Sequence, residues 1–251
     1  MYTEPLRAVI LDNDETTGSY QIVYSILKSL KKQGNIDKLL FYHILEKLAT
    51  WMVKESVFRP GLIAFLKTLV VLKKENKIDV IIMYTNQHEP DTNIVNSLPR
   101  CIQYMFMFLV PGFFFDHMLT RPETSIVINN IYTKQFKRVL DLYPRRPLDN
   151  TQMLFFDDLA SPLYVRDDDI KIKSDSSRVL VKPYSCILSK EQIEECIRYC
   201  LDDLVDYKTF TDSVMEYYLS FDMEIDNNLT IPMDCSYFID LVKSKYNSDG
   251  K

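Results

Sequence analysis

Acidic and hydroxyl side chains follow the first apolar segment of the chain at a spacing that suits phosphoryl chemistry. The sequence LDNDETTG carries Asp12 and Asp14 two residues apart, with Thr16 two residues further on. Side chains alternate between the two faces of a strand, and this alternation stops where the strand ends. A loop at this point can therefore direct both carboxylates toward one place. One could attack a phosphorus atom as the nucleophile while the other transfers protons. A turn that caps a helix would explain this motif equally well if it stood alone.

Three later segments offer the other groups that such a reaction needs. Thr85 and Asn86 follow an apolar run, where a hydroxyl and backbone N–H groups can hold a phosphoryl oxygen. Lys134, expected at the start of a helix, could neutralise charge on the nucleophile and on the transferred group. The segment LFF ends on Asp157 and Asp158, and two acids beside the first motif would repel each other without a cation. Hard oxygen ligands of this kind favour Mg²⁺.

Apolar strands alternate with helical patterns along the chain. Strands are predicted at 7–12, 78–85, 152–158 and 178–184. Helices are predicted at 19–33, 36–52, from 60 onward, 133–143 and 189–205, the last opened by a capping box. The proline-interrupted residues 86–131 are expected to hold mixed short elements. This order predicts an α/β fold whose mostly parallel sheet is covered on both faces.

The predicted sheet should gather the chemical groups at one edge. In open parallel sheets, ligands bind beyond the carboxyl ends of the strands. Asp12, Thr85 and Asp157 each follow or end a predicted strand. We therefore expect these three side chains to converge on one crevice.

Composition excludes several classes of protein. The chain has 251 residues, of which 47% are hydrophobic and 26% charged, as in an ordinary globular protein. Its net charge of -5 argues against a general nucleic-acid binder, so no direct nucleic-acid contact is expected. Its 5 glycines lie far apart, which excludes both a Walker loop and a dinucleotide-binding G-x-G-x-x-G.

Cysteine usage and hydropathy indicate the surroundings of the protein. The 5 cysteines form no C-x-x-C pair, which suits reduced thiols better than a disulfide framework. No segment has the form of a signal peptide, and the longest apolar stretch is too short to span a bilayer. We expect a soluble protein of the cytoplasm or nucleus without membrane contact.

Taken in order, the four motifs resemble those of the haloacid dehalogenase-like (HAD) phosphohydrolase superfamily. The segments FRPGLIAFLKTL (58–69), IYTKQFKRVLDL (131–142) and MLFFDDLASPLYV (153–165) are similar to one of its branches. That branch contains the RNA polymerase II C-terminal-domain phosphatases and the NLI-interacting factor-like proteins. The chain departs from the family at Thr17 and Gly18, where two apolar residues are usual. It also departs in the long helical stretch 19–55, where the branch carries a small β-excursion.

The resemblance implies a domain organisation and a set of roles. It implies a HAD-like Rossmannoid domain over 1–206, with a helical insert or small cap at about 19–56, a second insert at 86–131, and a C-terminal helical extension at 207–251. The implied catalytic residues are the nucleophile Asp12, the acid and base Asp14, and the phosphoryl-binding Thr85 and Lys134. Thr16 and Asn86 are implied to bind substrate. The implied Mg²⁺ ligands are Asp12, the backbone carbonyl of Asp14, Asp157 and Asp158.

Three functions remain open at this stage. The first is a Mg²⁺-dependent phosphatase acting through an aspartyl-phosphate, whose substrate would be a phosphoserine or phosphothreonine protein. That anionic substrate could be attracted by a rim of basic side chains, which would consist of Arg59, Lys134, Lys137, Arg138, Arg145 and Arg146. The second is a phosphatase for nucleotides or sugar phosphates, with the helical insert as a lid. The third is a HAD-fold scaffold without turnover. The sequence does not predict the oligomeric state.

Overall fold

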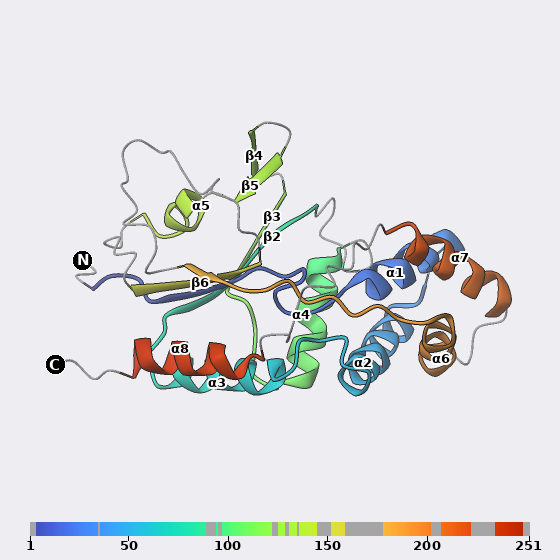
Figure 1. Ribbon diagram of the computed structural model, residues 1–251, viewed down its shortest axis with the longest axis horizontal. Helices are drawn as coiled ribbons and strands as arrows, with labels where there is room; N and C mark the ends of the chain where they lie inside the picture. Colours follow the sequence, from blue (N-terminus) through green and yellow to red (C-terminus); the bar gives the residue numbers. More distant parts are fainter. Residues whose placement is uncertain are drawn as a thin grey trace.

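The computed structural model has a parallel sheet at its centre. It describes residues 4–34, 36–88, 94, 97–121, 125–128, 131–134, 136–144, 152–158, 178–201, 207–221 and 234–247. The sheet has five strands, all parallel, in the order β3-β2-β1-β6-β7 (Figure 1). Its strands are β1 (Ala8–Leu11), β2 (Val80–His88), β3 (His117–Arg121), β6 (Met153–Asp157) and β7 (Arg178–Leu180).

Helices and one hairpin surround this sheet. The hairpin pairs β4 (Ser125–Ile128) with β5 (Ile131–Lys134) in antiparallel fashion. The helices are α1 (Gln21–Gln33), α2 (Lys38–Lys54), α3 (Leu62–Lys74), α4 (Leu98–Leu109), α5 (Phe136–Asp141), α6 (Lys190–Cys200), α7 (Tyr207–Leu219) and α8 (Ser236–Tyr246). The arrangement is an α/β, Rossmann-like fold, which confirms the predicted fold class.

Both faces of the sheet are apolar, as parallel strands covered on two sides require. In β1, Val9 and Leu11 pack into the larger core cluster, to which α3 and α8 also contribute. Ala8 and Ile10 point to the opposite face and join a smaller cluster that includes Val139 of α5. Because side chains alternate along a strand, a slip of one residue would exchange the two sets. The two cores therefore fix the register that brings the strand ends together.

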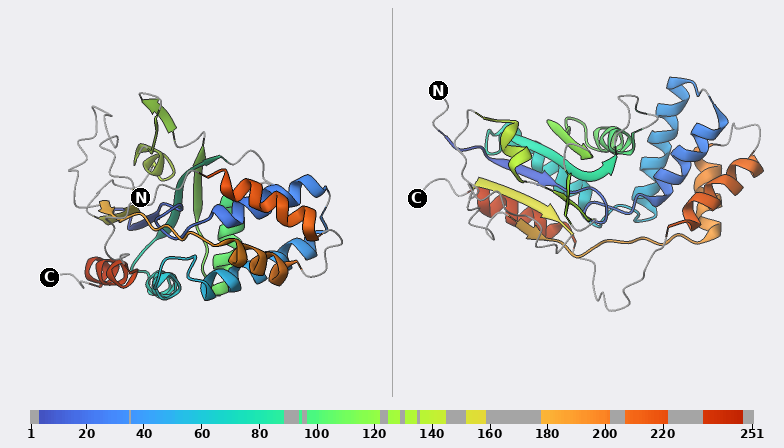
Figure 2. Two further views of the ribbon diagram at one scale, coloured as in Figure 1. Left: turned by 45° about the vertical axis from the view of Figure 1, so that its right-hand side comes forward. Right: turned by 90° about the horizontal axis from the view of Figure 1, so that it is seen from above.

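A group of helices lies beyond the carboxyl ends of the strands. Helix α1 packs against α7 and α4, α2 packs against α4 and α6, and α6 packs against α7. The arrowheads of β2 and β6 point toward this group in the right-hand view of Figure 2. The expected insert at 19–56 supplies α1 and α2, and the capping box predicted at Ser189 and Gln192 opens α6. Gly34 ends α1 with a φ of 98°.

One segment matches the elements predicted for it and another differs. Residues 86–131 contain α4, β3 and β4, in line with the mixed elements expected there, and β3 is the edge strand of the central sheet. The predicted helix at 133–143 is wrong at its start, because residues 131–134 form β5 and α5 begins at Phe136. The β-branched and aromatic residues Ile131, Tyr132 and Thr133 favour the pairing with β4.

The helices beyond residue 206 share the core with the sheet. Helix α8 runs beside α3 (Figure 1), and Phe238 packs its ring against Phe65 of α3 and Phe156 of β6. Helix α7 packs on α1, where the hydroxyls of Ser29 and Ser213 are 3.0 Å apart. The expected C-terminal extension at 207–251 thus supplies, in its described part, two helices that cover other elements.

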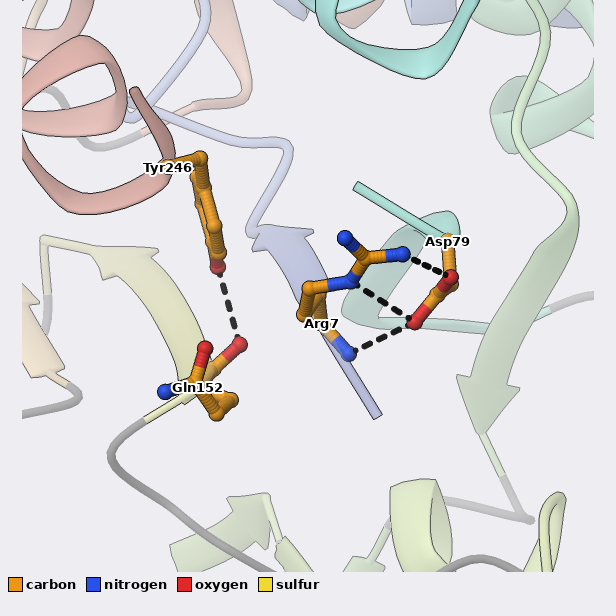
Figure 3. Close-up of polar contacts among 4 residues, drawn as sticks. All are labelled: Arg7, Asp79, Gln152 and Tyr246. Carbon is orange, nitrogen blue, oxygen red and sulfur yellow. Dashed lines mark hydrogen bonds and ion pairs between the residues drawn. The ribbon is translucent and has the colours of Figure 1, made fainter. Parts of the chain in front are cut away.

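Polar contacts link the residues just before three strands with each other and with α8, at the amino-terminal ends of the strands (Figure 3). The Arg7 guanidinium and backbone N–H donate to Asp79, just ahead of β2, with a closest distance of 2.8 Å. The Tyr246 hydroxyl donates to the carbonyls of Ala8, at 2.8 Å, and Gln152, at 3.1 Å. Burial raises the pKa of Tyr246, so this hydroxyl stays protonated as a donor. One side chain of α8 thereby links β1 to β6.

Removing the Tyr246 hydroxyl should weaken the fold without touching the opposite edge. Tyr246→Phe removes the donor to the buried Ala8 carbonyl and to the half-buried Gln152 carbonyl, so we expect the free energy of unfolding to fall by about 1 kcal/mol. Tyr237→Phe is the matched control, because Tyr237 lies on the same helix with 47% of its side chain exposed. Urea unfolding should separate the two variants; equal midpoints would contradict the proposed link.

Two further sequence expectations can be compared with the structure. All five cysteines are free, and Cys196 and Cys200 are buried in α6. Among the described residues, no helix combines the length and apolar character needed to cross a membrane.

Candidate functional site

The candidate site lies where the order of the strands reverses. From β1 the chain builds β2 and β3 on one side, then crosses to place β6 and β7 on the other. Ligands of open α/β sheets bind at such a switch point, beyond the carboxyl ends of the strands. Asp12 follows the last residue of β1, and Asp157 ends the adjacent strand β6. The backbone N–H of Asp12 donates to the Phe156 carbonyl at 2.9 Å, which extends the pairing to this point.

Three carboxylates meet at this edge and form what we call the acid cluster: Asp12, Asp157 and Asp158. One oxygen from each lies within 4.8 Å of the others. Asp12 is 4% exposed and Asp157 is fully buried, while Asp158 is half-buried. Carboxylate oxygens at this spacing can serve together as ligands of one cation. The acid cluster could therefore hold a metal ion, and its oxygen donors suit hard cations such as Mg²⁺, Ca²⁺ or Mn²⁺.

Residues 12–18, which we call the motif loop, turn sharply after β1. The Glu15 N–H donates to the Gly18 carbonyl at 2.9 Å, and Glu15 takes a φ of 56°. The Thr17 hydroxyl donates to the Asn13 carbonyl at 2.8 Å. A Cβ on Gly18 would lie 3.1 Å from the Val57 carbonyl oxygen. A side chain at position 18 would therefore need the backbone at Val57 and Phe58 to shift by a few tenths of an ångström.

Thr16 supports the acid cluster from within the motif loop. Its hydroxyl donates to one oxygen of Asp158 at 3.1 Å, and its side chain is fully buried. The resemblance implies that Thr16 binds substrate, and this stays a prediction. In the structure its hydroxyl contacts a carboxylate of the acid cluster.

Arg59 holds the motif loop and is not part of an exposed rim, so that expectation is wrong for this residue. Only 1% of Arg59 is exposed. Its guanidinium donates to the carbonyls of Glu15 and Thr16 in the loop and of Lys182 beyond β7, at 2.5 to 2.6 Å. It also lies over the Tyr184 ring, 5.4 Å from the centroid. Backbone carbonyls that turn inward here need a donor, which is the reason a charged side chain is buried.

Burial and neighbouring charges shift the pKa values of two groups at the motif loop, Glu15 and Arg59. Burial raises the pKa of the Glu15 carboxyl, and the charges of Asp14 and Asp12 raise it further, while Arg59 opposes them. Burial lowers the pKa of Arg59, and the nearby Asp158 carboxylate favours its charged form.

Strand β2 contributes hydroxyl and amide groups to the same edge. Thr85 is 1% exposed, and its hydroxyl accepts from the Gln87 backbone N–H at 3.2 Å. The Gln87 side-chain amide donates to the Asp14 carboxylate, which ties β2 to the motif loop. The pairing of β2 with β3 shifts register between Tyr84 and His88, and such irregularities often re-aim side chains beside sites.

The remaining predicted residues are placed by backbone alone. Asn86 lies within β2 and Lys134 ends β5, but their side chains lie outside the described part of the chain. Of the other residues expected in a basic rim, Arg138 is exposed on α5. The side chain of Lys137 and the whole of Arg145 and Arg146 lie outside the described residues.

Sequence reasoning missed the roles of two residues. The R-P-G sequence at 59–61 drew attention to Arg59, but its basic type suggested an exposed position. Gln87 carried no signal other than its place two residues after Thr85. Comparisons of the chain with protein-family models, with curated proteins and with solved structures found no match.

Cation binding to the acid cluster should be measurable as thermal stabilisation. At roughly ten times its dissociation constant, Mg²⁺ or Ca²⁺ should raise the Tm by about 4 °C. Asp157→Asn should abolish most of the cation response, because it removes one of the three carboxylates that could hold the ion. Asp212→Asn on the exposed face of α7 is the control and should keep the full response. A wild-type Tm unaffected by either cation would contradict the site.

Loss of the Arg59 guanidinium should be costly for stability. Arg59→Leu leaves three inward-facing carbonyls without their donor, and we expect unfolding free energy to fall by about 3 kcal/mol. Chemical denaturation measures this loss. A decrease similar to that of an exposed control, Arg138→Leu, would show that the guanidinium does not hold the motif loop.

Proposed function

We propose that this protein is a Mg²⁺-dependent phosphatase that hydrolyses a phosphomonoester through an aspartyl-phosphate on Asp12. The observation that carries the proposal is the convergence of the acid cluster and the D-x-D-x-T loop at the switch point of the sheet. The motif order that resembles the HAD superfamily supplies the roles of the individual residues.

The first step would transfer the phosphoryl group to the protein. A carboxylate oxygen of Asp12 attacks phosphorus, and the bond from phosphorus to the leaving oxygen breaks. Asp14 gives its proton to that oxygen, so an alcohol departs and Asp14 is left as a carboxylate. Asp14 is two residues from Asp12 in a loop braced by Arg59, which places both acids at one edge.

The second step would release phosphate and restore the site. A water oxygen attacks phosphorus, its proton passes to Asp14, and the acyl-phosphate bond breaks with its electron pair returning to Asp12. The protein ends the cycle unchanged. The same residue therefore acts first as acid and then as base, which requires it to remain in one place through both steps.

Mg²⁺ would neutralise negative charge so that a carboxylate can approach a phosphoryl group. The residues that would hold it are Asp12, Asp157, Asp158 and the backbone carbonyl of Asp14. Two buried carboxylates and one half-buried carboxylate, with an oxygen of each within 4.8 Å of the others, fit a hard divalent cation. The Thr85 hydroxyl and Lys134 would hold the phosphoryl oxygens, with Asn86 beside them.

For the substrate class, we propose first a phosphoserine or phosphothreonine protein, as the similarity to C-terminal-domain phosphatases suggests. The alternative is a nucleotide or sugar phosphate, with α1 and α2 as part of a lid. We also propose a setting in the cytoplasm or nucleus, because all five cysteines are free thiols.

Hydrolysis of p-nitrophenyl phosphate tests the proposed reaction. The wild-type protein should turn it over with Mg²⁺, lose activity in EDTA, and lose at least about a thousandfold in kcat as Asp12→Asn. Asp212→Asn, which alters an exposed acid far from the motif loop in sequence, should retain activity.

Two results would change this proposal. A folded wild-type protein with no Mg²⁺-dependent turnover would favour a scaffold without catalysis. Activity on nucleotides or sugar phosphates with none on phosphopeptides would favour the small-molecule alternative.

A further inference from the structure

Gln87 makes a side-chain contact to the acid of the proposed reaction. Its Nε2 donates to Oδ2 of Asp14, across 73 residues of sequence. Its backbone N–H donates to the Thr85 hydroxyl at 3.2 Å, so the same residue also touches the predicted phosphoryl-binding group. Both contacts lie where the register of β2 with β3 shifts. Gln87 thus connects the second motif directly to the first.

The other end of the Gln87 amide argues against a purely structural role. Its Oε1 is buried and has no hydrogen-bond partner among the described residues. A buried acceptor without a donor costs stability, whereas an apolar side chain of similar size carries no such cost. A glutamine kept here for folding would be expected to satisfy both ends of its amide. The contact to Asp14 is the feature that an apolar residue could not provide.

We propose that Gln87 is a positioning residue that acts through Asp14. This inference rests on the proposed function, since it assigns the residue that holds the acid and base of that reaction. The donated hydrogen bond fixes one oxygen of Asp14, which leaves the other oxygen to carry the proton toward the leaving group. Without the amide, the Asp14 carboxyl can rotate, and protonation of the leaving oxygen becomes less efficient.

The nature of the leaving group can isolate this effect. Phenyl phosphate releases a basic phenolate that needs a proton as the bond to phosphorus breaks. p-Nitrophenyl phosphate has the same ring, but its nitro group stabilises the departing anion, so the proton matters less. The ratio kcat/KM reports the steps up to release of the phenol. A residue that acts through the acid must therefore affect the two substrates unequally.

Gln87→Leu should lower kcat/KM about tenfold for phenyl phosphate and less than about threefold for p-nitrophenyl phosphate. Gln87→Asn keeps the amide but is one methylene too short, so it should give the same selective loss. Gln103→Leu is the matched control, because Gln103 on α4 also has a buried Oε1 without a described partner. It should leave both ratios unchanged. Gln87→Leu should also keep or raise the Tm, and the Mg²⁺-induced rise in Tm should remain.

Each other outcome contradicts the inference in a distinct way. Equal losses on both substrates, or a Tm lowered more by Gln87→Leu and Gln87→Asn than by Gln103→Leu, would mean that Gln87 supports the fold rather than Asp14. Unchanged kinetics would mean that the contact has no role. A wild-type protein inactive on both substrates would overturn the proposed function, and this inference would fall with it.

Discussion

The convergence of three carboxylates at the carboxyl ends of the strands is the arrangement on which this account depends. Two members of the acid cluster are almost fully buried, where separated charges interact more strongly than in water. Parallel pairing of β1 with β6 forces Asp12 and Asp157 together, because both follow the same point in the strand register. The fold thus brings together three carboxylates that could hold a metal ion.

The elements around the acid cluster serve to hold it in place. Arg59 joins the motif loop to the segment after β7, and the ring of Phe238 lies 5.7 Å from its guanidinium. Helix α8 therefore contacts the arginine that holds the motif loop, although this helix comes from the last part of the chain. The hydroxyl of Tyr246, on the same helix, donates to the Ala8 carbonyl at the amino-terminal ends of the strands. Positioning of the site and stability of the core come from the same contacts.

Local patterns predicted most of the central fold, and contacts distant in sequence account for what they missed. The apolar runs at β1 and β6 predicted both strands and the acids that follow them, because parallel strands must bury both faces. The positions of β3 and β5 were not predicted, because β3 lies in a stretch that several prolines interrupt, and part of β5 was assigned to the helix that begins at Phe136. The burial of Arg59 depends on carbonyls from 15, 16 and 182, and no local pattern reveals such a set.

A crystal structure with Mg²⁺ and beryllofluoride, a phosphoryl mimic, tests the central claim most directly. The account predicts a cation about 2.0–2.1 Å from carboxylate oxygens of Asp12 and Asp158, with the mimic bonded to Asp12 and touching Thr85. Ordered density for the acid cluster with neither ion bound at saturating concentrations would contradict it. So would a mimic bound away from β1, because the reversal of strand order would then not mark the site.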